Sequence, residues 1–249
     1  MSKIIGIVSG KGGVGKTTLC AGLAFALASL GKNVIALDGD VGLKNLDILL
    51  GMADNTAFDL TDILAERCTI GKAVQVHEKF SNLHFISASQ NAEADSIDKT
   101  AFRKLCRYLR THYDYVLIDA PAGLGAGFYN IIDSCDECLV VATSDLTSIR
   151  DAEKTAGILS GINNLTAYLV LNKINQQMIK KGYLQNVDDV IDNISLQLIG
   201  LIPADNNMVL YSNIGTPIIN TKSVCAQPVK NIAKRIMGES VPLDKRWRK

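Results

Sequence analysis

The segment SGKGGVGKTT at 9–18 constrains the fold of this chain more than any other stretch. It fits the pattern G-x-x-x-x-G-K-[ST], whose fixed positions are taken by Gly10, Gly15, Lys16 and Thr17. An apolar, β-branched run at 4–8 precedes the segment, and leucines at helical spacing follow it as far as Gly31. The segment is therefore predicted to be a loop between a buried strand and a helix, the setting in which this pattern binds phosphate.

Four glycines give the loop its chemistry, because a backbone without Cβ atoms can curl and turn its N–H groups toward an anion. The helix that begins near Lys16 adds the positive end of its dipole. The Lys16 ammonium is expected to bridge the terminal phosphates of a nucleotide, and the Thr17 hydroxyl to ligate Mg²⁺. The residues predicted to contact the nucleotide phosphates are Gly10, Lys11, Gly12, Gly13, Val14, Gly15, Lys16, Thr17 and Thr18.

Further apolar, strand-like runs alternate with helical patterns along the rest of the chain. The runs lie at 33–38, 83–87, 115–119, 139–143, 167–172 and 197–203, and the clearest helical patterns at 99–112, 147–159 and 229–237. This alternation predicts an α/β fold, with a doubly wound, mostly parallel sheet flanked by helices, as in P-loop NTPases. No linker or repeat interrupts the alternation, so we expect one domain over 1–237, followed by a basic tail at 238–249.

Charge and cysteine spacing exclude several classes of function. The net charge of +1 gives no bulk attraction to nucleic acid, so no specific nucleic acid is expected as a partner. The sequence shows no signal peptide and no apolar run of membrane-spanning length, which indicates a cytoplasmic location. Cys135 and Cys138 form a C-x-x-C spacing, but a metal or redox role would need a second pair of ligands, and Cys138 opens an apolar, strand-like run.

Aspartates stand at the ends of two predicted strands, the edge at which parallel sheets bind ligands. Asp38 and Asp40 follow the second strand, and Asp119 ends the run at 115–119. Carboxylates beside a nucleotide repel its phosphates unless they serve a cation or position water. We therefore expect Asp38 and Asp119 to serve Mg²⁺ together with Thr17, and Asp40 to orient the attacking water. The alternative is that these aspartates cap helices at surface turns.

Lys11 is surplus to the phosphate-binding pattern, because Lys16 already serves the terminal phosphates. From the outer lip of the loop, the Lys11 ammonium could reach the nucleotide of its own subunit or that of a facing subunit. In the second case it would add positive charge to the transition state, as an arginine finger does. The residues alone leave open a third interpretation, a solvated lysine in a turn.

The sequence KGGVGKTT at 11–18 resembles the deviant Walker A loop of the MinD/ParA family of P-loop ATPases. Further segments resemble motifs of that family in the same order. They are the first switch at 38–47, the second switch at 119–123, a helix start at 148–153, and the adenine-side motifs at 171–173 and 202–205. The resemblance runs from residue 3 to about 237, which is nearly the whole chain.

The resemblance implies an ATP hydrolase that needs Mg²⁺, dimerises with itself when ATP is bound, and is reset by hydrolysis. It is closest to members of the family that determine the septum site in cell division. It also implies that Min-type regulators resembling MinE and MinC dock near Asn45 and Asp151, at the inner face of the cell membrane.

The resemblance also assigns residue roles, which remain expectations at this point. Lys11, Lys16 and Asp40 would be catalytic, with Lys11 acting across the dimer. Thr17 and Asp119 would hold the magnesium side. The residues expected to hold the adenine are Asn172, Pro203 and Asp205.

The C-terminal tail departs from the family pattern, in which an amphipathic helix inserts into the membrane. Pro242 interrupts helix formation, and too few residues follow it for a stable amphipathic helix. Trp247 nevertheless lies among four cations, Lys245, Arg246, Arg248 and Lys249. Tryptophan flanked by cations favours a lipid interface, whereas a block of cations is also typical of a solvated tail. Any peripheral attachment to a membrane is expected to be weak.

Two other functions stay open on the same fold. A ParA-like ATPase for DNA partition or flagellar placement would need salt-dependent DNA binding, which the near-neutral charge does not favour. A metabolic or redox ATPase is the other possibility. A reductase that resembles the nitrogenase iron protein would need a cysteine from each subunit at a shared interface, and an amidoligase would need extra chain for its substrate and ammonia supply.

Overall fold

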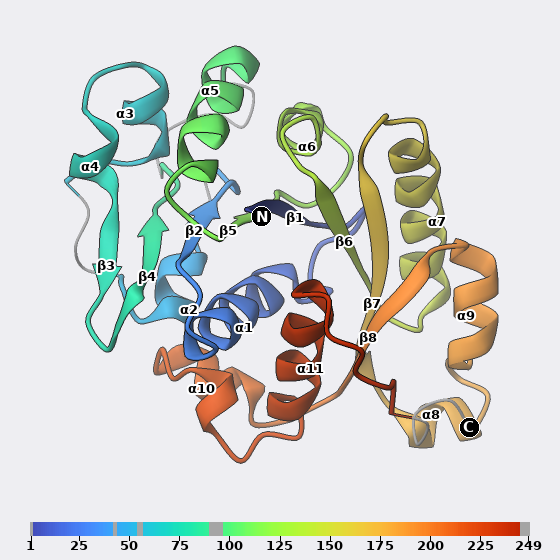
Figure 1. Cartoon of the computed structure of the whole chain (residues 1–249). Coiled ribbons are helices and arrows are strands. Elements are labelled where there is room, and N and C mark those ends of the chain that lie inside the picture. Colours follow the sequence, from blue (N-terminus) through green and yellow to red (C-terminus); the bar gives the residue numbers. More distant parts are fainter. Residues whose placement is uncertain (1, 42–43, 54–56, 90–96, 245–249) are drawn as a thin grey trace.

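A computed structural model describes residues 2–41, 44–53, 57–89 and 97–244 (Figure 1). Its strands are β1 (Lys3–Val8), β2 (Val34–Asp38), β3 (Gln75–His77), β4 (Phe80–Ile86), β5 (Tyr115–Asp119), β6 (Glu137–Ala142), β7 (Thr166–Ile174) and β8 (Gln197–Pro203). Its helices are α1 (Lys16–Ser29), α2 (Leu46–Leu50), α3 (Leu60–Leu64), α4 (Ile70–Ala73), α5 (Lys99–Arg110), α6 (Ala126–Ile132), α7 (Leu146–Ser160), α8 (Gln176–Lys180), α9 (Val187–Ile194), α10 (Met208–Asn213) and α11 (Ala226–Ile236), with a short 3-10 helix at Ile218–Asn220.

The strands form one sheet in the order β3-β4-β2-β5-β1-β6-β7-β8. Neighbouring strands are parallel except for β3 and β4 at one edge, which are antiparallel. The loop at 9–15 leaves the central strand β1 and leads directly into α1. Helices cover both faces of the sheet (Figure 1). The predicted doubly wound, mostly parallel α/β fold is confirmed.

An apolar core lies on each face of the sheet. One core joins the sheet to α5, α6, α7 and α9, with Phe102 and Phe128 fully buried. The other joins the sheet to α1 and α11, which lie side by side in Figure 1, with Phe25 and Ile232 fully buried. Strands β2 and β5 are buried along their whole length because helices pack on both sides. Their sequences are accordingly continuous apolar runs rather than alternating ones.

The structure shifts some predicted boundaries and adds elements. The helix predicted at 229–237 begins at Ala226, because Pro228 fits in the first helical turn, where its missing N–H needs no partner within the helix. The helix predicted at 99–112 ends at Arg110. The edge strand β3 was not predicted, since three residues give no readable apolar run.

The described part of the C-terminal tail packs on the rest of the protein. Arg235 donates hydrogen bonds to the carbonyl oxygens of Val241, at 2.8 Å, and Pro242, at 2.7 Å. Leu243 packs against the core that contains α5 and α7. Trp247 and the four cations around it lie outside the described residues. No helix among the described residues has the length and apolar character needed to cross a membrane.

Candidate functional site

The loop at 9–15 has the backbone that its glycines make possible. Gly13 and Gly15 have φ angles of 77° and 97°, in the left-handed region that glycine adopts without strain. Gly15 is the N-cap of α1. A Cβ at Gly15 would lie 2.3 Å from the Asn172 side-chain nitrogen, so no larger residue fits there without displacing Asn172. At Gly10, a Cβ would lie 2.9 Å from the carbonyl oxygen of Asp151 in α7.

A cavity of about 740 Å³ opens beside this loop at the carboxyl edge of the sheet, within the usual size of a small-molecule site. The predicted site residues that line it are Gly12, Gly13, Gly15, Lys16, Thr17, Thr18, Asp40, Asn172, Pro203 and Asp205. The predicted residues that do not line it are Gly10, Lys11, Val14, Asp38 and Asp119.

Sequence reasoning did not find other parts of the cavity wall. The apolar residues of the wall that lie outside the predicted motifs are Leu19, Met208, Ile218, Cys225 and Val229. Several of these come from the last part of the chain, and they look like ordinary core positions in the sequence. Lys173, which belongs to the adenine-side motif expected at 171–173 but was given no role of its own, also lines the cavity.

Asp119 lies below the loop, at the end of β5, and is 1% exposed. Thr17 forms a hydrogen bond with its carboxylate, while the Asp119 Oδ1 atom has no hydrogen-bond partner. Burial raises the pKa of the Asp119 carboxyl to about 8, although the Thr17 hydrogen bond and the Lys16 charge oppose the shift. A buried carboxylate oxygen without a partner costs free energy unless a cation or water binds to it.

Asp38 is engaged differently. Its side chain is fully buried, and its two oxygens accept hydrogen bonds from the backbone N–H groups of Asp40, Asn45 and Leu46. Burial raises the pKa of Asp38 to about 6, against these hydrogen bonds. Asp38 thus holds the segment that carries Asp40 and Asn45 in place at the rim of the cavity.

The Lys16 side chain is almost buried, at 7% exposure, in the cavity wall. Burial lowers the pKa of Lys16, and the charges of Asp119 and Asp40 oppose that shift. Burial in turn raises the pKa of Asp40, while Lys16 lowers it. Lys16, Asp119 and Asp40 thus form a group of interacting charges beside the loop, of which Lys16 and Asp40 line the cavity.

The side chains present fit Mg²⁺, which prefers oxygen ligands and keeps several of its waters when it binds beside phosphates. The Thr17 hydroxyl and the unpartnered Asp119 Oδ1 atom are such oxygens. Within the described ranges, no cluster of three or more His, Cys, Asp or Glu side chains could hold a metal by itself. A magnesium ion would therefore depend on water and phosphate for its remaining ligands.

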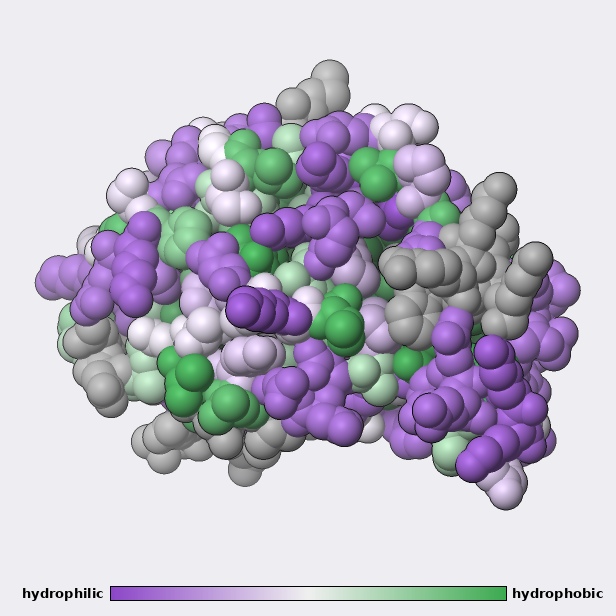
Figure 2. All heavy atoms as spheres, turned by 90° about the horizontal axis from the view of Figure 1, so that it is seen from below, coloured by the Kyte–Doolittle hydropathy of each residue, from purple (hydrophilic) through white to green (hydrophobic). Residues whose placement is uncertain are grey.

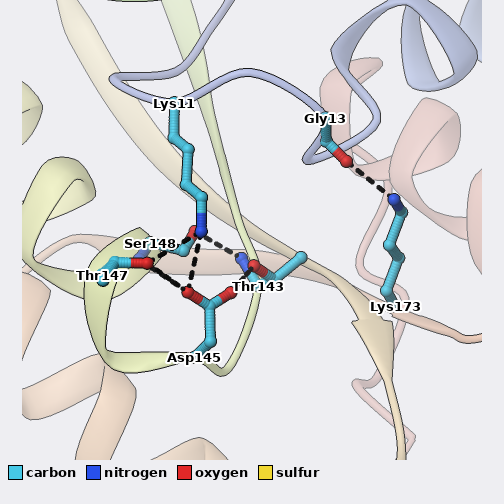
Figure 3. Close-up of polar contacts among 7 residues, drawn as sticks. All are labelled: Lys11, Gly13, Thr143, Asp145, Thr147, Ser148 and Lys173. Carbon is cyan, nitrogen blue, oxygen red and sulfur yellow. Dashed lines mark hydrogen bonds and ion pairs between the residues drawn. The ribbon is translucent and has the colours of Figure 1, made fainter.

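The Lys11 side chain does not line the cavity and points toward the start of α7 (Figure 3). Its ammonium donates to Asp145 Oδ1 at 3.0 Å and to Thr147 Oγ1 at 2.7 Å. Although burial opposes the shift, hydrogen bonds from Thr143, Thr147 and Lys11 hold the pKa of Asp145 well below its usual value. Asp145 also caps α7 by accepting from the Ser148 N–H. In this structure the surplus lysine is partly exposed, binds an aspartate and does not line the cavity of its own subunit.

The expected adenine-side residues lie together at the ends of β7 and β8. The Asn172 side-chain nitrogen donates to the Val14 carbonyl at 2.8 Å. Asp205 accepts a hydrogen bond from Ser223 Oγ, and the Pro203 carbonyl accepts one from Cys225 Sγ. These contacts tie the far wall of the cavity to the loop and to the segment before α11.

Cys135 and Cys138 lie away from the cavity, against the middle of β1. A Cβ at Gly6 would lie 3.0 Å from Cys135 Sγ and 3.3 Å from Cys138 Sγ. The hydrogen bond with Cys138, together with burial, raises the pKa of the Cys135 thiol well above its usual value. Both cysteines are free thiols, and the raised pKa makes the Cys135 thiol poorly reactive. Cys138 is thus part of the apolar core, and Cys135 packs against that core.

Comparison with known proteins gives consistent matches. A family model described as "AAA domain" matches residues 2–178. The septum site-determining protein MinD of Synechocystis sp. is 37% identical over 97% of this chain and 92% of its own length. MinD of Bacillus subtilis is 36% identical over 98% of this chain and 92% of its own length.

Solved structures agree with these relatives. The chain superposes on MinD in the MinC:MinD cell division protein complex of Aquifex aeolicus with a TM-score of 0.91, at 35% identity, over 98% of this chain and 99% of the other. It superposes on septum site-determining MinD complexed with Mg-ADP from Pyrococcus horikoshii with a TM-score of 0.85, at 28% identity, over 95% of this chain and 96% of the other.

Proposed function

Because this chain belongs to the MinD septum-site-determining ATPases of the MinD/ParA family, we propose that ATP drives it into a reversible homodimer and that hydrolysis resets it. The observation that carries the proposal is the placement of two lysines. Lys16 lies in the cavity, whereas Lys11 lies on the outer lip of the same loop, outside its own cavity. A lysine placed there is suited to a nucleotide held by a facing subunit.

Within one subunit, the proposed roles follow the geometry. Lys16 and the loop N–H groups bind the phosphates, and Asp40, on the cavity wall, orients the attacking water. Thr17 and Asp119 hold the magnesium side, and bound Mg²⁺ would neutralise phosphate charge. Asn172, Pro203 and Asp205 form the adenine end of the cavity. Asp38 contributes by fixing the loop that carries Asp40.

The surface around the cavity suits an interface that forms and dissociates. Figure 2 shows the molecule from below the view of Figure 1, where α8 and α10 lie, with apolar side chains in small groups among hydrophilic ones. Exposed apolar residues of these helices include Met178 and Leu210. Such a mixture is typical of non-obligate interfaces, whereas permanent ones are more apolar.

We infer partners from the relatives. The MinC:MinD complex of Aquifex aeolicus supports a MinC-type partner. We propose in addition that a MinE-type regulator binds this chain. Asn45 lines the cavity rim, and the Asp151 backbone packs on Gly10 of the loop, so both predicted contact residues lie close to the proposed nucleotide site. A partner bound there would sense whether ATP is present.

We also propose that this chain is cytoplasmic and that residues 245–249 attach it weakly to the inner face of the membrane.

Light scattering of the purified chain tests the dimer directly. We expect a monomer without nucleotide and with Mg·ADP, and twice the monomer mass with Mg²⁺ and a non-hydrolysable ATP analogue. Lys16→Ala is the control, since it removes the cation that faces the phosphates, and it should stay monomeric with the analogue. A parent chain that binds the analogue and remains monomeric would contradict the proposal.

Magnesium binding should release a proton from Asp119. With a pKa of about 8, this carboxyl is mostly protonated at neutral pH, and a bound cation favours the ionised form. We therefore expect Mg·ADP affinity to rise with pH up to about 8, with release of up to about one proton per site near pH 7. Calorimetry in two buffers of different ionisation enthalpy measures that number. The control is ADP with a chelator, which should release fewer protons, and equal release in both cases would refute the assignment.

A further inference from the structure

Two consecutive residues at the end of β7 hold two consecutive carbonyl groups of the phosphate loop. The Lys173 ammonium donates to the Gly13 carbonyl at 2.7 Å, as Figure 3 shows. The Asn172 side-chain nitrogen donates to the Val14 carbonyl at 2.8 Å. The Asn172 Oδ1 atom accepts from the Lys173 backbone N–H at 2.9 Å, which fixes the orientation of the amide.

These contacts determine where the loop N–H groups point. In a trans peptide, the carbonyl of one residue and the N–H of the next point in opposite directions, and the described residues contain no cis peptide bond. Holding the Gly13 and Val14 carbonyls toward β7 therefore directs the N–H groups of Val14 and Gly15 away from β7. Backbone N–H groups of such a loop are the donors that a phosphate binds.

The loop needs this restraint because it is rich in glycine. Glycine has the largest backbone freedom of any residue, so an unrestrained loop would sample many shapes and lose that freedom when it binds an anion. The Lys173 backbone is itself held at φ 56°, a left-handed conformation that is uncommon for a residue with a side chain. The same residue, Lys173, thus combines an uncommon backbone conformation with the side-chain contact to Gly13.

The three lysines around the loop have distinct contacts. Lys16 lies in the cavity beside Asp119 and Asp40, and Lys11 binds Asp145. Lys173 has an exposed side chain in the cavity wall, and its ammonium binds a loop carbonyl, so its charge acts on the shape of the loop.

We propose that Lys173 is a positioning residue that holds the phosphate loop in its nucleotide-binding shape before the nucleotide arrives. The inference rests on the proposed function of the cavity as a nucleotide site. It assigns Lys173 no contact with the reacting atoms. Its loss should weaken ATP and ADP alike, since both share the phosphates that the loop binds, and should leave the hydrolytic step unchanged once nucleotide is bound.

The test compares Lys173→Met, which keeps the aliphatic stem and removes the charge, with Lys173→Arg and with Lys181→Ala, an exposed lysine at the end of α8. For Lys173→Met we expect about tenfold higher Kd for both ATP and ADP. We expect KM to rise similarly, with kcat within about twofold of the parent. Lys173→Arg should recover most of the affinity, and Lys181→Ala should match the parent.

Hydrogen exchange without nucleotide gives a second readout. In Lys173→Met the backbone amides of Val14 and Gly15 should exchange faster than in the parent, while those of the central strands stay protected. Parent-like Kd values and parent-like exchange in Lys173→Met would overturn the inference while leaving the proposed function intact. A parent chain that binds neither nucleotide would instead overturn the proposed function, and this inference with it.

Discussion

Replacing Asp40 by asparagine is expected to lower ATP turnover by about 10²- to 10⁴-fold, the range typical of a positioned acid–base group. Asp40 lies on the cavity wall near Lys16, where its carboxylate can accept a proton or a hydrogen bond from water. Asparagine has the same size but loses the negative charge. Nucleotide affinity should not fall, because the variant removes a negative charge beside the phosphates. The ATP-bound dimer should therefore accumulate.

Phosphate release measures the turnover, and light scattering measures the dimer. The matched control is Asp192→Asn, which makes the same change on an exposed position of α9 and should leave both quantities unchanged. If Asp40→Asn hydrolysed ATP within about threefold of the parent rate, Asp40 could not be the group that orients the water.

Replacing Lys11 by alanine is expected to lower ATP turnover by about 10³-fold or more, the range for a cation supplied to phosphoryl transfer in trans. Binding of ADP to the monomer should stay unchanged, since Lys11 does not line its own cavity. Fluorescent nucleotide titration measures the ADP affinity. A matching loss of ADP affinity would show that Lys11 serves the nucleotide of its own subunit.

Lys11 must leave Asp145 before it can act across a dimer. Both side chains of this ion pair are 39% exposed, and exposed pairs contribute only about 0–1 kcal/mol, so nucleotide contacts can outweigh it. Asp145→Asn is the companion variant, because asparagine remains a good N-cap for α7 and loses the charge that attracts Lys11. This variant should dimerise at lower ATP concentration than the parent.

The parts of the site that could be predicted are formed by residues that lie close together in the sequence. The loop, its glycines and Lys16 form one contiguous pattern between a strand and a helix, and the aspartates follow apolar strands at a shared edge. The fold followed from the same alternation of runs. The residue roles assigned to this pattern stay predictions until the variants above are measured.

The parts that were not predictable depend on contacts between distant residues. Lys11 and Asp145 are 134 positions apart, and Lys173 and Gly13 are 160 apart. Contacts between residues so far apart cannot be predicted from a single sequence, because only the fold brings β7 and the start of α7 to the loop. The cavity wall around Val229 was not predicted for the same reason. In the sequence, an apolar helical residue that lines a cavity cannot be distinguished from one that packs in the core.

Mixing the two inactive variants, Lys11→Ala and Asp40→Asn, tests the in-trans role of Lys11 most directly. If Lys11 serves the facing subunit, a mixed dimer has one complete site, formed by Asp40 of one variant and Lys11 of the other. Random pairing makes about half of the dimers mixed, with about half of their sites complete, so turnover should recover to roughly a quarter of the parent rate. A mixture as inactive as either variant alone, with dimers present by light scattering, would contradict a switch built on a lysine acting across the dimer.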